Sequence, residues 1–449
     1  MNREALLAFS KEDLVALILA QEVQIDALAA RVAELEAKLN APPKTPDNSS
    51  IPPSAGQKPN HPDRLKKPRR SRPGVSRSLA EHPDRVIDAT LAACPHCAHP
   101  LGPADQADIH VYDHVEVPPI TPVITRINRH HGTCPCCHRH VAAPAPEGFE
   151  LGSPFGPGLR ALIIHLHVTQ AISFERLVRL LGEVFGVVIS EGAIVNILSR
   201  AQAPLVAAAA PIAQAVRSST VVGSDETSAR VGGKTWWQWV LLSSTAIFHV
   251  IVPRRAAAVV EEFLDGAKPE IWIADRYAGQ IGHGAARQLC LAHLLRDARY
   301  AIEEGDNVFA SGFKVLLLRA VAIGRRRDNL KDSTLKQYHG DLERRLDRLL
   351  ARAPDTPAAR RLFNAMRRDR DDLFRFITRR DVPYTNNACE RALRPSVIFR
   401  KVTNCFRSQW GAKVYAAAAS VIATGRLHGL SALQALSNAL AGKPIIRTA

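Results

Sequence analysis

The sequence lacks an uninterrupted apolar run of the ~18 residues that a membrane-spanning helix needs. Its nearest approach, Ala201 to Val216, is broken by two prolines and two glutamines. The N-terminus also lacks a basic stretch followed by an apolar core, so we predict no signal peptide. We therefore expect a cytosolic protein with no membrane partner.

Acidic residues are also scarce relative to basic ones. The 449 residues include 43 Asp and Glu against 59 Lys and Arg, which gives a formal charge of +16 and a pI near 9.8. Such an excess favours polyanionic partners, nucleic acid above all. Hydrophobic residues make up 46% of the chain, which excludes wholesale disorder, and the length predicts about three modules.

Residues 1–41 carry the clearest helical pattern. Ser10, followed by Asp13, is typical of a helix start, with Asp in place of the usual Glu of a capping box. Apolar residues then recur at alternating steps of four and three, as in the seam of a coiled coil. The seam is Leu14, Ile18, Gln21, Ile25, Leu28, Val32, Leu35 and Leu39. The pattern favours pairing with a second copy; docking on the chain's own domain is the alternative.

Residues 42–85 form a basic, proline-rich linker. Nine prolines lie between positions 41 and 80. Lys66, Lys67, Arg69 and Arg70 form the densest basic run of the linker. We expect these four side chains to contact DNA phosphates, although a solvated charged linker would have the same composition.

Residues 86–145 contain two CxxC pairs. Cys94 and Cys97 form the first, and Cys134 and Cys137 form the second. Each CxxC turn places two thiolates on one side, so two turns complete a tetrahedral shell for one structural Zn²⁺. The alternating stretch between them suits a zinc ribbon. Cys136 lies too close to Cys134 for a normal turn and is the weaker alternative to Cys137.

Residues 155–215 are predicted to be helical. One helix begins at Ser173 and runs to Phe185, and another opens at Ser190 after a short turn that starts with Gly186. A helix, a turn containing glycine and a second helix outline a helix-turn-helix, which predicts a DNA-binding region. A purely structural helix pair is the alternative.

From residue 219 the pattern changes to strands. An apolar run ends at Asp225, a hairpin with Gly232-Gly233 at its turn follows, and a second buried run ends at Asp275. Strand-end carboxylates suit hard cations such as Mg²⁺ or Mn²⁺. Glu226, next to Asp225 on the strand, should point to the opposite face.

A third acid, Glu390, lies in the run Asn386-Asn-Ala-Cys-Glu-Arg-Ala-Leu-Arg394-Pro at the start of a predicted helix. Either asparagine of this run could cap that helix. Segment 319–401 carries 22 basic residues against 11 acids, which favours a helical insertion that holds DNA.

Several of these motifs together resemble the insertion-sequence-66 family of bacterial Asp-Asp-Glu transposases. They are Gly223-Ser-Asp-Glu-Thr227, the Trp236-Trp237 hairpin, Asp275-Arg-Tyr277, Cys290-Leu-Ala-His-Leu-Leu-Arg-Asp297 and the run that holds Glu390. The resemblance covers nearly the whole chain. It implies a multidomain α+β protein: the coiled-coil helix, the zinc ribbon, the helical DNA-binding region and a ribonuclease-H-like catalytic domain with a helical insertion.

On that resemblance the catalytic domain spans 216–300 and 381–410, the insertion 301–380, and a C-terminal helical region 411–449. Asp225, Asp275 and Glu390 are then the catalytic acids, which hold two Mg²⁺ or Mn²⁺ ions. His293 and Arg296, together with Arg391 and Arg394, are expected to contact DNA.

The resemblance also implies partners and surroundings. It predicts cleavage at insertion-sequence ends and strand transfer, with terminal inverted repeats and target DNA as partners. We expect a homodimer or larger homo-oligomer near the bacterial nucleoid, with possible small accessory proteins of the same element. Two alternatives stay open: a zinc-containing DNA-binding regulator without catalysis, and a metal-dependent nuclease without strand transfer.

Overall fold

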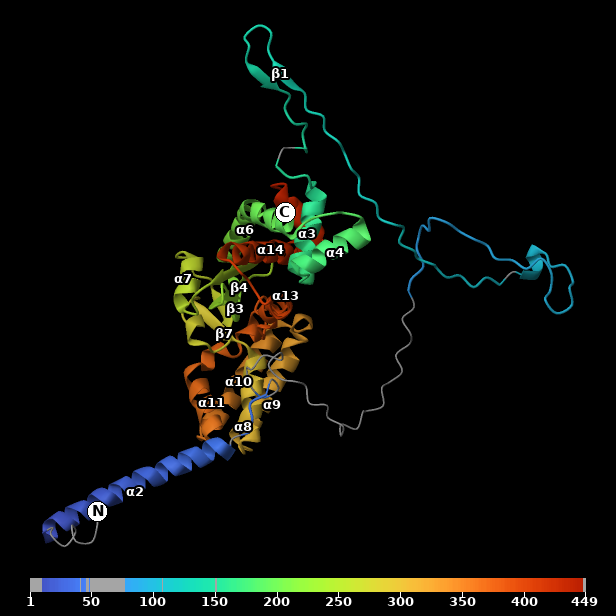
Figure 1. Cartoon of the computed structure of the whole chain (residues 1–449). Helices are drawn as coiled ribbons and strands as arrows, with labels where there is room; N and C mark the ends of the chain where they lie inside the picture. Colours follow the sequence, from blue (N-terminus) through green and yellow to red (C-terminus); the bar gives the residue numbers. More distant parts are fainter. Residues whose placement is uncertain are drawn as a thin grey trace.

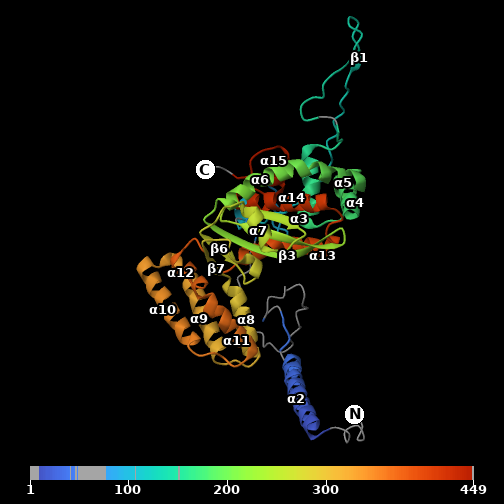
Figure 2. The ribbon, with the colours of Figure 1, turned by 90° about the vertical axis from the view of Figure 1, so that its left-hand side faces the viewer.

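The computed structural model describes residues 10–40, 42–45, 48, 77–106, 108–149 and 152–446. A body formed by residues 152–446 carries two N-terminal appendages, the helix α2 (Lys11–Asn40) and the segment 77–149 (Figures 1 and 2). The fold is mixed α+β with a five-stranded sheet at its centre.

The helix α2 follows the predicted N-terminal pattern closely. Ser10 accepts a hydrogen bond from the backbone N–H of Asp13 at 3.1 Å, as an N-cap does, and its hydroxyl donates to the Asp13 carboxylate. The helix extends away from the body (Figure 1). Its apolar residues Ile18, Ile25 and Leu28 are about two-thirds exposed within a single chain. Pairing with a second copy stays a prediction.

The segment 77–149 contains little regular structure. Its described elements are the 3₁₀ turn η1 (Pro103–Gln106) and two short antiparallel strands, β1 (His131–Thr133) and β2 (His140–Ala142). The segment runs outside the body as an extended chain, with β1 at its upper end in Figure 1. Its apolar residues are mostly exposed, including Val123 and Ile124.

Four helices form the first layer of the body: α3 (Pro157–Gln170), α4 (Phe174–Phe185), α5 (Glu191–Arg200) and α6 (Gln202–Arg217). The predicted boundaries hold. Ser173 and Ser190 occupy the N-cap positions of α4 and α5, and the Ser190 hydroxyl accepts a hydrogen bond from Ala193 N. Gly186 ends α4 with a φ of 62°, the left-handed conformation that glycine adopts readily.

The span Glu191–Arg217, which joins α5 and α6, is long and apolar enough to cross a membrane by length and composition alone. The packing of α6 accounts for its apolar character within the fold. Leu205, Ile212 and Val216 are fully buried, and α6 lies against α14 (Gln409–Leu427) and β5 (Ile247–Val252).

The central sheet has the strand order β5-β4-β3-β6-β7. The strands β3 (Val221–Val231), β4 (Lys234–Leu242) and β5 are antiparallel, whereas β6 (Ile271–Ala274) and β7 (Ala286–Leu289) run parallel to β3. The hairpin turn at Gly232-Gly233 is where the sequence predicted it. The strand β7 was not predicted, because Ala286-Arg-Gln-Leu289 has no alternating or continuous apolar pattern.

Helices cover the sheet and its free edge. The helix α7 (Ala257–Leu264) packs with α6, α14 and α15 (Ala432–Leu440) around one core. On the outer strand β5, Ser420 and Thr424 of α14 accept hydrogen bonds from the backbone N–H groups of His249 and Ile247. These hydroxyls satisfy strand donors that would otherwise attract another strand.

A second core begins at the parallel strands and includes the helices of 301–380, where the sequence predicted a helical insertion. It joins α8 (Leu291–Glu303), α9 (Phe309–Gly324), α10 (Asp332–Leu350), α11 (Pro357–Arg368) and the short α12 (Arg375–Thr378). Ile271, Ile273 and Leu289 of the two parallel strands belong to the same core. The helices form a bundle beyond β6 and β7 (Figure 2), so the insertion is built directly on the parallel part of the sheet. The remaining long helix, α13 (Asn387–Thr403), packs on β3 and β4.

Candidate active site

Asp225 lies in the middle of β3, on the face that α13 covers. Gly223, two residues earlier on the same face, brings α13 close: a Cβ added to it would lie 3.2 Å from Cys389 Sγ and 3.3 Å from Asn386 Oδ1. One carboxylate oxygen of Asp225 accepts a hydrogen bond from Glu226 N at 2.9 Å. The sequence predicted Asp225 at a strand end, but β3 continues for six residues beyond it.

Asp275 directly follows β6, as predicted. Its Oδ1 accepts a hydrogen bond from Tyr277 N at 2.9 Å, which fixes the carboxylate at the start of the loop. Since β6 lies next to β3 and runs parallel to it, the strand delivers Asp275 to the neighbourhood of Asp225. Arg276, between Asp275 and Tyr277, forms an ion pair with Asp297 of α8.

Glu390 lies in the first turn of α13. The predicted capping role of Asn386 is only half right: it occupies the N-cap position, but its side chain makes no cap hydrogen bond. Its amide donates instead to the Ser224 carbonyl at 2.7 Å, and its backbone N–H donates to Cys290 Sγ at 3.1 Å. Asn386 thus joins the helix of Glu390 to the strand of Asp225 and to the start of α8.

His293 and Arg296 lie three residues apart on α8 and both face Glu390. Arg296 Nη2 is 3.2 Å and His293 Nε2 is 3.8 Å from the Glu390 carboxylate. The Nδ1 atom of His293 is buried without a hydrogen-bond partner among the described residues. The two side chains therefore belong to the same cluster as the acids, although contact with DNA stays a prediction.

The electrostatics link the other acids to Asp225. Burial raises the pKa of Asp225 well above its usual range, and the charges of Glu226, Asp275 and Glu390 raise it further. Burial also lowers the pKa of His293, as does the charge of Arg296, against the opposing effect of Asp275 and Glu390. A cation placed among these groups would relieve the repulsion between the acids.

The donor chemistry of the cluster suits a hard divalent cation, because it consists of carboxylate oxygens. Among the residues that the structure describes, however, no three His, Cys, Asp or Glu side chains stand in the arrangement of a finished metal site. The carboxylate of Glu390 is instead hydrogen-bonded to Arg296. Asp225, Asp275 and Glu390 are the residues that would hold the ions.

Behind the cluster, Glu226 points to the opposite face of β3, as predicted. Its carboxylate is buried and accepts hydrogen bonds from Arg255 at 2.8 and 3.0 Å and from Gln280 at 2.8 Å. The Arg255 guanidinium lies over the rings of Trp237 and Tyr277, 4.7 and 4.1 Å from their centroids. This contact holds the loop that follows Asp275 against β3 and the hairpin.

Comparison with known proteins decides the family. The family model described as the IS66 family of transposases matches residues 152–414, more than half of the chain. This protein belongs to the IS66 transposase family. No curated protein matches the chain.

The matched part of this IS66 family member contains all three acids, the two α8 residues and the exposed arginines Arg391 and Arg394 of α13. None of the described residues forms an ion pair with either arginine, so both remain available to an external anion. Lys66, Lys67, Arg69 and Arg70 lie outside the described residues.

The two CxxC turns precede the matched part, and they share one backbone conformation. Cys94 N donates to His99 O and Cys134 N donates to Arg139 O, both at 2.9 Å, and Ala98 and His138 both have positive φ. Backbone N–H groups near the second cysteine of each pair lower the pKa of Cys94 and of Cys134. A lowered pKa favours the thiolate that a metal needs.

The positions of the two turns differ. The first turn lies near η1 and the second beside β1, at separate places along the extended arm (Figure 1). The structure therefore does not gather four thiolates, and the single Zn²⁺ stays a prediction that requires the turns to meet. Cys136, Cys97 and Cys137 are exposed.

Sequence reasoning missed three residues of the active-site region. The role of Asn386 was misjudged because a helix-start asparagine usually caps its own helix. Arg255 lies in a loop and Gln280 in the short 3₁₀ helix η2 (Ala278–Gln280), and neither belongs to a motif. Their only signal is spatial, since each approaches Glu226 from an element distant in sequence.

Proposed function

We propose that this IS66 family member is a DNA transposase that cleaves strands at the ends of its insertion sequence and transfers them into target DNA. The observation that carries the proposal is the convergence of Asp225, Asp275 and Glu390. Asp225 lies on a central strand, Asp275 follows the parallel strand next to it, and Glu390 lies in the first turn of the helix that packs on the strand of Asp225. In this arrangement the charges of Asp275 and Glu390 both raise the pKa of Asp225.

The sheet supports the same proposal. Three antiparallel strands followed by two parallel ones, with the acids on β3 and after β6, agree with the ribonuclease-H-like architecture that the family resemblance implies. When bound, two divalent cations would activate the attacking oxygen and stabilise the leaving 3′-oxygen. The chain's own residues hold and orient the ions and the DNA.

The surrounding side chains have distinct tasks in this proposal. Arg296 balances the charge of Glu390 and would give way to bound cations, whereas His293, whose pKa is lowered, lies 3.8 Å from the same carboxylate as a neutral ring. Asn386 fixes the distance between α13 and β3 through Ser224. Arg391 and Arg394, exposed in the first two turns of α13, contact the phosphates that flank the reacting bond.

The direct test is cleavage of a duplex that carries the element's own end, with Mg²⁺. Asp225→Asn should reduce cleavage by at least ~10³-fold, because neutral oxygen is a poor substitute for an ionised ligand. Asp265→Asn is the matched control: Asp265 caps α7 in a left-handed conformation that Asn tolerates, so cleavage should stay within a factor of two.

The melting temperatures of both variants show whether a loss of cleavage is caused by unfolding. Replacement of a buried, repelled carboxylate by an amide should leave Asp225→Asn at least as stable as the wild type. Equal cleavage by wild type and Asp225→Asn would reject the assignment of the acids. If the wild type cuts but does not join a pre-cut 3′ end to target DNA, the protein is a nuclease. If it binds the duplex but never cuts, the regulator interpretation is correct.

A further inference from the structure

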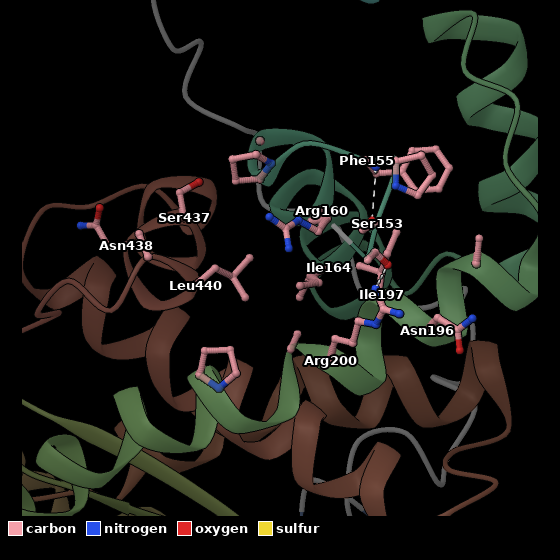
Figure 3. Close-up of a pocket in the computed structure, with 18 of the residues that line it drawn as sticks. Ser153, Phe155, Arg160, Ile164, Asn196, Ile197, Arg200, Ser437, Asn438 and Leu440 are labelled. Atoms are coloured by element: carbon pink, nitrogen blue, oxygen red, sulfur yellow. Dashed lines mark hydrogen bonds between the residues drawn. The ribbon is translucent and has the colours of Figure 1, made fainter. Parts of the chain in front are cut away.

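A pocket of about 510 Å³ lies where α3, α5 and α15 meet, away from the acids. Figure 3 shows Arg160 of α3 and Arg200 of α5 on one side of it, and Ser437, Asn438 and Leu440 of α15 on the other. The chain enters the body beside this pocket at Gly152, directly after the cysteine-rich arm. Neither the family model nor the acid cluster assigns a role to it.

The charge of the pocket is of one sign. Arg160, Arg200 and Lys443 line it, and the described residues that line it include no acid. Its other polar groups are neutral hydroxyls and amides, such as those of Ser153 and Asn196. Three cations gathered without a counter-charge attract an anion from solution.

The two arginines are held in different ways. The Nε atom of Arg160 is buried and has no hydrogen-bond partner among the described residues, which leaves a desolvated donor without an acceptor. Arg200 donates to the carbonyl of Gly152. Gly152 has a φ of +120°, and a Cβ added to it would lie 3.4 Å from Arg200 Nη1, so the backbone there fits closely around this guanidinium.

The rest of the wall is apolar. Phe155, Pro157 and Leu440 contribute to it, and the cavity is larger than a phosphate ion alone requires. A ligand that fits both the cationic and the apolar walls of the pocket has an anionic group next to a weakly polar ring. A phosphodiester with its adjoining deoxyribose has this composition, because protein contacts to DNA are mostly to phosphate and sugar.

We propose that this pocket binds one backbone phosphate of DNA, through Arg160, Arg200 and Lys443. The inference rests on the proposed function, since it gives the helical layer of a DNA transposase a defined contact with its substrate. It places one DNA contact of the helical layer at the junction of α3, α5 and α15, whereas the sequence predicted DNA binding by the helix-turn-helix of α4 and α5, which stays a prediction.

The test measures the affinity of the full chain for a fluorescein-labelled duplex of arbitrary sequence, as a function of salt and without divalent cations. Loss of one phosphate contact lowers the salt slope by about 0.9, which corresponds to roughly eightfold weaker binding near ~0.1 M salt. We expect Arg160→Gln to show this change. Lys443→Gln, at the exposed rim, should weaken binding in the same direction.

Two controls make the result specific. Arg160→Lys keeps the charge and should retain most of the salt slope. Lys268→Gln removes an exposed charge between α7 and β6 and should change neither the affinity for DNA nor the salt slope. An unchanged slope in folded Arg160→Gln overturns the proposal; if that variant unfolds, an unchanged slope in Lys443→Gln does so.

A free phosphate is the competing occupant. If inorganic phosphate raises the melting temperature of the wild type but not of Arg160→Gln, more than chloride at equal ionic strength, and DNA binding is the same in both, the pocket serves a small phosphorylated ligand and the DNA assignment is wrong. Because no divalent cation is present, the outcome is independent of cleavage. If the acids prove not to be catalytic, the DNA-binding result for the pocket can therefore still be interpreted.

Discussion

The two N-terminal appendages and the body of the protein reach very different degrees of burial. In the body, Trp239, Trp272 and Phe313 are completely buried. In α2 and in the segment 77–149, Ile25 is 64% and Val123 94% exposed. The body buries most of its large apolar side chains within one chain, whereas the appendages leave most of theirs exposed to water.

The difference has a physical cause. The strands β1 and β2 are three residues long, and α2 is a single helix, so neither element has a second layer against which to bury a face. Apolar residues in such elements are buried only when a metal closes a turn or a second copy covers a helix. We therefore expect the appendages, unlike the body, to depend on ligands and partners for their order.

The largest effect should come from loss of metal in the segment 77–149. Protein purified without chelator should contain about one zinc per chain, and Cys94→Ser and Cys134→Ser should lose it, since structural zinc contributes on the order of 10 kcal/mol. Metal analysis and limited proteolysis measure this. New cleavage sites should appear within 77–149, and the melting temperature of the body should not change.

Cys136→Ser is the matched control for this experiment, because Cys136 lies in the second turn but outside the CxxC pair. It should retain zinc. Equal zinc content in Cys94→Ser and in the wild type would show that the first turn holds no metal. Loss of body stability in the same variant would contradict the independence of the two regions.

The next largest effect concerns α2. Ile25→Glu places a charge in the apolar seam and should weaken self-association by at least tenfold, because a buried carboxylate without a partner is unfavourable. Sedimentation velocity at several concentrations measures the change. Gln24→Glu adds the same charge next to the seam and should leave the association unchanged. A monomeric wild type would rule out pairing through this helix.

A smaller effect is confined to the body and concerns how its stability depends on pH. His249 on β5 is fully buried beside Gln238, and burial lowers its pKa from 6.5 to about 4. The unfolded chain therefore takes up a proton in this range before the folded chain does. The stability that the neutral ring provides is present above pH 6.5 and is lost as pH falls toward 4, by about 3 kcal/mol in total.

Urea unfolding of the wild type and of His249→Gln at several pH values tests this expectation. Whatever the stability of the variant at pH 7, its free energy of unfolding should fall less steeply than that of the wild type between pH 6.5 and pH 4. Equal slopes for both proteins would mean that His249 is not the group that titrates.

The active site shows where sequence reasoning succeeds. Asp225 and Asp275 were located from apolar runs that end in an acid, because a buried strand needs consecutive apolar residues whatever its partners. Glu390 required the family motif, since a helix-start acid among arginines is common on protein surfaces. The pattern could not show that Arg296 and His293 contact Glu390 from another helix.

The sequence by itself determined the elements: the N-caps at Ser10, Ser173 and Ser190, the hairpin turn at Gly232-Gly233, and the basic and cysteine-rich composition of the appendages. These features arise from interactions between residues close in the chain. The tertiary structure alone decided that Asn386 ties α13 to β3, that Glu226 pairs with Arg255, and that three cations surround a pocket between α3, α5 and α15. Such contacts join residues far apart in sequence, and only the packing of the whole body brings them within hydrogen-bonding distance.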